Sequence, residues 1–205
     1  MELSPSLQQK IRAWRLMRCR GAIIVQKLLK LFGRYRVGDQ EPLHLIAVDL
    51  AQQGQLLWGF HPFGDHGQAQ LAAQADVLVE NFRPGVMARF GLDYARLKTT
   101  CPNLIYLSIS AYGQEGEMSD RPGFDPVLQA ESGMMSITGE PDGAPMRHPI
   151  SIIDTMTALQ AVGAVTAALF ARTSNGGKGQ QIDLALMDVA IAALGNAGGY
   201  YLASG

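Results

Sequence analysis

The sequence predicts an α/β fold in which a Rossmann-like parallel sheet is flanked by helices. Two segments carry this prediction. DVLVE (76–80) and NLIYLSIS (103–110) are short apolar runs, which is typical of strands covered on both faces. The segment between them, 86–100, has helical spacing of its larger apolar side chains. Strand, helix and strand at these intervals indicate βαβ units and therefore parallel strands.

The remaining elements of the first half follow the same logic. LHLIAVDL (43–50) is rich in β-formers and predicts a strand, and QAQLAAQA (68–75) is built from helix formers. Pro84 and Gly85 end the strand at 76–80, and Pro84 is expected in the first turn of the next helix. That helix is expected to run through 86–100, with Met87, Phe90, Tyr94 and Leu97 on one face.

The second half is richer in small residues. Residues 124–140 show no clean period, and PDGAP (141–145) predicts a turn. Residues 154–172 predict a long helix, with Asp154 or Thr155 as its N-cap and Asn175-Gly176-Gly177 as its stop. QQIDLAL (180–186) predicts a short strand or a strand leading into a helix, and 187–205 begins a further helix.

Composition favours a globular, reduced protein. Of 205 residues, 47% are apolar and 17% are charged, which argues against disorder. No uninterrupted apolar run reaches the ~18 residues of a membrane span, so no membrane contact is expected. A secretory signal is not evident, and Cys19 and Cys101 lack metal or disulfide spacing, which fits a cytoplasmic protein.

The net charge of −1 hides a basic amino-terminal segment. Nine Lys and Arg side chains oppose Glu2 alone within residues 1–36. We interpret 1–42 as a solvated extension and 43–205 as the folded part; an anion-binding arm or an organelle import signal is the alternative. Nucleic-acid binding is not expected, because no aromatic side chains interleave with the charges for base stacking.

ENFRPG (80–85) is the first candidate site. It leaves a predicted strand at the edge of the sheet where open α/β folds bind ligands. The Asn81 amide can pair with a polar ligand edge, the Phe82 ring can stack, and the Arg83 guanidinium can bind phosphate. An adenine nucleotide with phosphates suits this set; an ordinary turn with a solvated arginine is the alternative.

Asp154 is the second candidate, and Asp125 is a further carboxylate of interest. Asp154 stands where a helix is expected to begin, so it is either an N-cap or a nucleophile that can form a covalent acyl intermediate. Asp125, in RPGFD, is either a supporting carboxylate or a loop-closing residue. His148 is expected to be structural, and no metal site, Ser-His triad, phosphate loop or nicotinamide fingerprint is predicted.

Three segments in order resemble the family III CoA-transferases, a group that includes formyl-CoA transferase and carnitine CoA-transferase. They are ADVLVENFRPGVMARFGLDYARLKTTCPNLIYLSISAYGQEG, RPGFDPVLQAESGMMSITGEPDGAP and SIIDTMTALQAVGAVTAALFARTSNGGKGQQIDLALMD. The resemblance runs from about residue 43 to 205. It implies transfer of CoA from an acyl-CoA donor to a small carboxylic acid, with acyl-CoA as substrate and no permanently bound cofactor.

The resemblance also assigns roles to single residues. Asp154 matches the nucleophilic aspartate, which forms mixed-anhydride and thioester intermediates, and Asp125 matches an acidic position near it. Asn81, Phe82 and Arg83 match the segment that holds the CoA nucleotide, and Arg89 matches a nearby basic contact. In the related α-methylacyl-CoA racemases a histidine precedes the acidic residue; here Phe124 stands there and cannot transfer a proton, which favours a transferase over a racemase-type enzyme.

The chain departs from the family pattern at 1–42 and at 52–68. It is expected to be a truncated member that lacks the first βαβ unit and the part beyond residue 205. Family members form interlocked homodimers, so the resemblance implies a homodimer. A shortened chain would lack some of the segments that interlock. The alternative function is an inactive remnant that binds CoA or a paralogous subunit.

Overall fold

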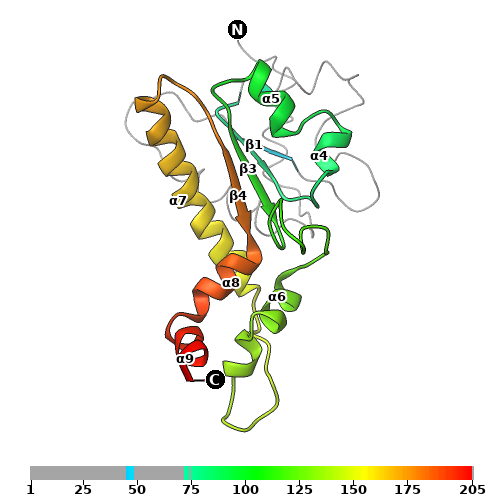
Figure 1. The fold of residues 1–205 in the computed structure, drawn as a ribbon, viewed down its shortest axis with the longest axis vertical. Coiled ribbons are helices and arrows are strands. Elements are labelled where there is room, and N and C mark those ends of the chain that lie inside the picture. Colours follow the sequence, from blue (N-terminus) through cyan, green and yellow to red (C-terminus); the bar gives the residue numbers. More distant parts are fainter. Residues whose placement is uncertain (1–44, 49–71, 74, 205) are drawn as a thin grey trace.

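The computed structural model describes residues 45–48, 72–73 and 75–204, and it contains a parallel sheet with helices on both faces (Figure 1). Four strands lie in the order β1-β2-β3-β4. They are β1 (Leu45–Val48), β2 (Val77–Glu80), β3 (Ile105–Ser110) and β4 (Gln181–Ala185), and every neighbouring pair is parallel. The predicted α/β fold is therefore confirmed.

One face of the sheet is covered by α7 (Ile152–Ser174) and α8 (Leu186–Leu194). Val77, Val79 and the alternating residues Ile105, Leu107 and Ile109 supply the strand side of this core. The helices supply mostly small side chains: Ala158, Ala161, Val165, Ala168 and Ala190. The small alanines let the α7 backbone lie close to the sheet.

The opposite face is covered by two short helices, α4 (Val86–Arg89) and α5 (Tyr94–Thr100). The alternate residues Leu78 and Tyr106 point to this side and pack with Met87, Leu92 and Leu97. The buried Tyr106 hydroxyl donates a hydrogen bond to the Leu92 carbonyl oxygen at 3.0 Å. This bond satisfies a backbone acceptor between the two helices and fixes them against β3.

The single helix predicted for 86–100 is wrong, because the chain breaks between α4 and α5. Gly91 has φ 68°, a left-handed conformation that ends a helix. Asp93 then caps α5 by accepting the Arg96 N–H at 3.1 Å. As a result Leu92 is buried, whereas Phe90 of the predicted apolar face is exposed.

The second half differs from its prediction in three places. The segment without a clean period contains α6 (Asp125–Glu131) and a 3-10 helix, η1 (Met134–Ile137). Helix α7 begins two residues earlier than predicted, with Ser151 as its N-cap. It ends at Ser174, with Asn175 as its C-cap, directly before the left-handed Gly176 and Gly177, as the predicted Asn175-Gly176-Gly177 stop requires. The last predicted helix is two helices, α8 and α9 (Asn196–Ser204), separated by Gly195 at φ 52°.

In the part of the chain that the structure describes, α7 is the one helix long and apolar enough to cross a membrane. Length and composition alone are a weak indication, because the core helix of a globular domain meets the same criteria. Here its buried residues pack on the sheet.

Several predictions fall on residues outside the described ranges. These are the basic segment 1–42, the departure at 52–68 and most of the predicted helix 68–75, of which the buried Ala72 is helical. The predicted strand at 43–50 is represented by β1, which pairs with β2 in register from Leu45 opposite Val77.

Candidate functional site

The turn after β2 is held by its own side chains. The Phe82 N–H donates to the Glu80 carboxylate at 2.9 Å, and the Asn81 side-chain amide donates to the Ile109 carbonyl oxygen at 2.8 Å. Asn81 therefore joins the carboxyl ends of β2 and β3. The predicted turn is present at the predicted edge of the sheet, and the Asn81 amide nitrogen also has a structural partner.

The next residues of this turn are more exposed. Phe82 is partly buried against the α4–α5 side of the core, whereas Arg83 is exposed and donates through Nη2 to the Asp120 carbonyl oxygen at 2.7 Å. A guanidinium has further N–H groups, so this bond leaves donors for an anion. Arg89, the last residue of α4, is also exposed.

The prediction for Pro84 is wrong. Gly85, at φ 81°, is the N-cap of α4, so Pro84 precedes the cap instead of lying in the first helical turn. Because α4 has only four residues, its helix dipole adds little to binding of an anion at this turn.

Glu80 is a feature of this edge that the sequence interpretation did not single out. It is 3% exposed, and burial raises the pKa of its carboxyl group from 4.5 to about 7. The charge of Asp183 raises this pKa further, whereas hydrogen bonds from Phe82 and Ser108 lower it. The register of the strands explains the cluster, since Ser108 lies opposite both Glu80 and Asp183. The sequence did contain a signal for this buried group, namely an acidic residue at the end of a fully apolar strand.

Asp154 lies in the first turn of α7, at the third helical position, and is partly exposed. The N-cap is Ser151, so the alternative reading of Asp154 or Thr155 as the cap is wrong. In the first turn the carboxylate lies at the positive end of a 23-residue helix, which stabilises negative charge.

Asp125 is brought next to Asp154, although 29 residues separate them in sequence. Asp125 is 3% exposed and begins α6, with the exposed Phe124 as the N-cap. Its Oδ2 accepts the Asp154 backbone N–H at 3.0 Å. One buried carboxylate thus supplies the acceptor for a backbone N–H in the first turn of α7, where the helix offers no carbonyl oxygen.

Gln129 completes this arrangement, and the sequence interpretation missed it. The residue is fully buried, its Nε2 donates to Asp125 Oδ1 at 2.5 Å, and its Oε1 accepts the His148 N–H at 2.8 Å. Spacing gave a partial signal, because Gln129 follows Asp125 by four residues and such pairs share a helix face. His148, predicted to be structural, contributes its backbone N–H to the cluster.

The carboxylates and the ENFRPG turn both lie beyond the carboxyl ends of the strands. Helix α7 runs opposite to the strands, because its last turn reaches the amino ends of β2 and β3 (Figure 1). Its first turn, with Asp154, is therefore at the carboxyl edge. Open α/β sheets bind ligands at this edge.

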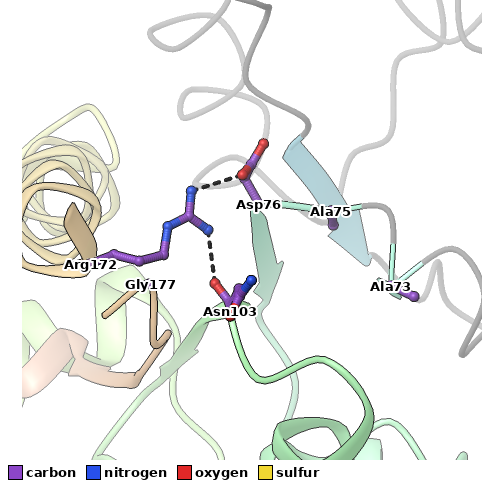
Figure 2. A pocket seen from close by; sticks show the side chains of 6 residues that line it. All are labelled: Ala73, Ala75, Asp76, Asn103, Arg172 and Gly177. Atoms are coloured by element: carbon purple, nitrogen blue, oxygen red, sulfur yellow. Dashed lines mark hydrogen bonds and ion pairs between the residues drawn. The ribbon is translucent and has the colours of Figure 1, made fainter. Parts of the chain in front are cut away.

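The hollow drawn in Figure 2 lies at the other end of the sheet. Arg172, near the end of α7, points between Asp76 and Asn103 and donates to the Asp76 carboxylate and the Asn103 carbonyl oxygen, both at 2.8 Å. These bonds anchor α7 to the residues that precede β2 and β3. We interpret this hollow as structural, because its charged groups are paired with each other and it is remote from Asp154.

Comparison with known proteins gives a consistent result. The model of CoA-transferase family III matches residues 62–205. Succinate–glutarate CoA-transferase of Agrobacterium fabrum is 46% identical over 136 residues, which are 66% of this chain and 34% of that protein. Acetyl-CoA:oxalate CoA-transferase of Acetobacter aceti is 38% identical over 170 residues, 82% of this chain and 43% of that protein.

Solved structures agree in fold. A CAIB/BAIF family protein from Brucella suis superposes with a TM-score of 0.66 at 42% identity, covering 69% of this chain and 37% of that one. The chain thus spans well under half the length of the relatives it matches. Since the family model covers most of the residues, and the motifs around Asn81, Asp125 and Asp154 lie inside it, the chain belongs to CoA-transferase family III.

Proposed function

We propose that this chain supplies the nucleophile and part of the CoA site for transfer of CoA from an acyl-CoA donor to a free carboxylate. The observation that carries the proposal is the position of Asp154. Asp154 is partly exposed at the carboxyl edge of the sheet, while its backbone N–H is held by the buried Asp125. A reactive carboxylate needs both access and a fixed position.

The chemistry proceeds by acyl transfer to and from Asp154. The carboxylate attacks the thioester carbonyl of the donor, the C–S bond breaks, and CoA leaves as a thiolate, so that the donor acyl group and Asp154 are joined in a mixed anhydride. The thiolate then attacks the aspartyl carbonyl, which releases the donor acid as a carboxylate and leaves an aspartyl-CoA thioester. The acceptor carboxylate reverses these two steps, so Asp154 is regenerated and no proton or electron is gained or lost overall.

The turn after β2 is proposed to hold the nucleotide part of CoA. Phe82 offers a partly exposed ring, and Arg83 and Arg89 offer exposed positive charges for phosphates. Asn81 fixes the turn through Ile109. Two of the relatives are named as CoA-transferases for glutarate and oxalate, which supports small carboxylic acids as acceptors. We also propose that the active form is a homodimer in the cytoplasm. Analytical sedimentation tests the oligomeric state, and cell fractionation tests the location.

The test is formation of a hydroxamate at Asp154. Purified protein is incubated with several acyl-CoA donors and hydroxylamine, which traps activated aspartate, and the modified peptide is identified by mass spectrometry. We expect wild-type protein to be modified and Asp154→Asn to be unmodified, with a loss of at least a hundredfold in donor consumption. Asp188→Asn is the matched control, because Asp188 is an exposed aspartate in the first turn of α8. Absence of reaction with every donor would overturn the enzymatic proposal.

A second candidate function is binding of CoA together with another polypeptide, without turnover. Large apolar side chains are exposed on the outer surfaces of α7, α8 and α9: Leu159, Phe170, Ile191, Tyr200, Tyr201 and Leu202. Large apolar side chains that gather on an exposed surface are typical of protein contacts. Calorimetric titration with free CoA separates the two functions, because binding without hydroxamate formation supports the second one.

A further inference from the structure

We propose that Gln129 is a positioning residue for Asp154, acting through Asp125 and through the chain segment that leads into α7. The inference rests on the proposed function, because it assumes that Asp154 is the nucleophile and that the rate of reaction depends on where its carboxylate is held. Gln129 itself is fully buried, so it does not face solvent.

The amide of Gln129 links the two ends of one short segment. Its Oε1 accepts the His148 N–H at 2.8 Å, before α7 begins. Its Nε2 donates to Asp125, whose other oxygen accepts the Asp154 N–H at 3.0 Å. Residues 148 and 154 are thus tied to the same buried pair on α6, so the turn that presents Asp154 is fixed at both ends.

The chemistry of the pair explains why an amide occupies this position. Asp125 offers two acceptor oxygens and needs donors, whereas His148 offers an N–H and needs an acceptor. A glutamine supplies one of each and carries no charge, so it does not compete electrostatically with the Asp125 carboxylate. An ionised carboxyl group in its place would face Asp125 with the same charge, and an apolar side chain would leave Asp125 and His148 each short of a partner.

These differences define two variants and a control. Gln129→Met keeps the length of the side chain and removes both hydrogen bonds. Gln129→Glu keeps them only while the introduced carboxyl group is protonated, because its hydroxyl can then donate to Asp125. Thr157→Val is the control for loss of a buried polar group in the same region, since Thr157 is fully buried in α7 and its hydroxyl has no hydrogen-bond partner.

The first measurement is amide hydrogen exchange at Asp154 in the full chain, followed by NMR. Gln129→Met is expected to lower the protection factor roughly tenfold at every pH. Gln129→Glu is expected to match wild type at acidic pH and to lose protection as the pH rises. Asp125, Asp154 and His148 carry further ionisable side chains in this region, so the wild-type profile serves as the reference. Thr157→Val is expected to leave protection unchanged.

The second measurement is the rate of hydroxamate formation at saturating and at low acyl-CoA. We expect the Gln129 variants to lower the saturated rate about tenfold and to leave the half-saturating concentration unchanged, since Gln129 positions the nucleophile and does not bind CoA. For Gln129→Glu the loss should follow the same pH profile as the exchange.

The two measurements separate the two claims. A wild-type protein without hydroxamate formation contradicts the proposed function, while the exchange data still decide whether Gln129 fixes Asp154. Unchanged Asp154 exchange in both Gln129 variants overturns the inference, whatever the chemistry. Altered exchange with an unaltered saturated rate also overturns it, because the position of Asp154 would then not matter for reaction.

Discussion

Replacement of Glu80 by glutamine is expected to remove most of the pH dependence of stability that this buried carboxyl group causes. Burial raises its pKa from 4.5 to about 7 in the folded protein. The folded state therefore binds a proton more tightly than the unfolded state does. The contribution to stability is fully present below pH 4.5 and is lost as the pH rises through about 7.

The magnitude follows from the two pKa values. With one pKa unit corresponding to about 1.36 kcal/mol, linkage gives a fall in the free energy of unfolding of about 2.5 kcal/mol between roughly pH 5 and pH 8. Glutamine can still accept the Phe82 N–H and can donate to Ser108, so the turn after β2 keeps its bonds. Glu80→Gln should therefore be more stable than wild type at alkaline pH, with a smaller difference in acid.

Urea unfolding followed by circular dichroism at a series of pH values measures this effect. The control is Glu117→Gln, which removes the same charge from an exposed position in the loop after β3. We expect the difference in unfolding free energy between Glu80→Gln and wild type to change by about 2.5 kcal/mol across this pH range. A difference that is constant with pH would refute the reasoning, because Glu80 would then have the same proton affinity in both states.

Two further substitutions test the packing of the sheet. Tyr106→Phe removes the buried hydroxyl that donates to the Leu92 carbonyl oxygen. We expect urea unfolding to show that the free energy of unfolding falls by about 1–3 kcal/mol, while the circular dichroism spectrum is unchanged. A fall below about 0.5 kcal/mol would contradict a structural role for this bond. Gly179→Ala places a methyl group against the backbone of Leu104, which cannot yield as a flexible side chain does. It should cost about 3 kcal/mol or more, whereas Gly163→Ala, in open space on α7, should leave stability unchanged or raised.

The fold class was readable from the sequence because it depends on local patterns. The apolar runs at 76–80 and 103–110 can be buried only as strands covered on both faces, and they are β2 and β3. The break within 86–100 was missed because the apolar spacing of Phe90 suggested a continuous helix. The left-handed Gly91 and the Asp93 cap end one helix and begin another, and that choice depends on which side chain, Phe90 or Leu92, fits the core.

The site shows the same division. By itself the sequence determined the parallel strands, the turn at Asn81–Arg83 and the candidate carboxylates Asp125 and Asp154, because residue type and local order indicate these features. Only the tertiary structure decided that Asp125 accepts the Asp154 N–H, that Gln129 joins Asp125 to His148, and that Glu80 is buried beside Ser108 and Asp183. The physical reason is distance along the chain. Apart from the Gln129–Asp125 bond within α6, these contacts join residues far apart in sequence. Burial and hydrogen bonding act through space on whichever groups the packed helices and strands bring together.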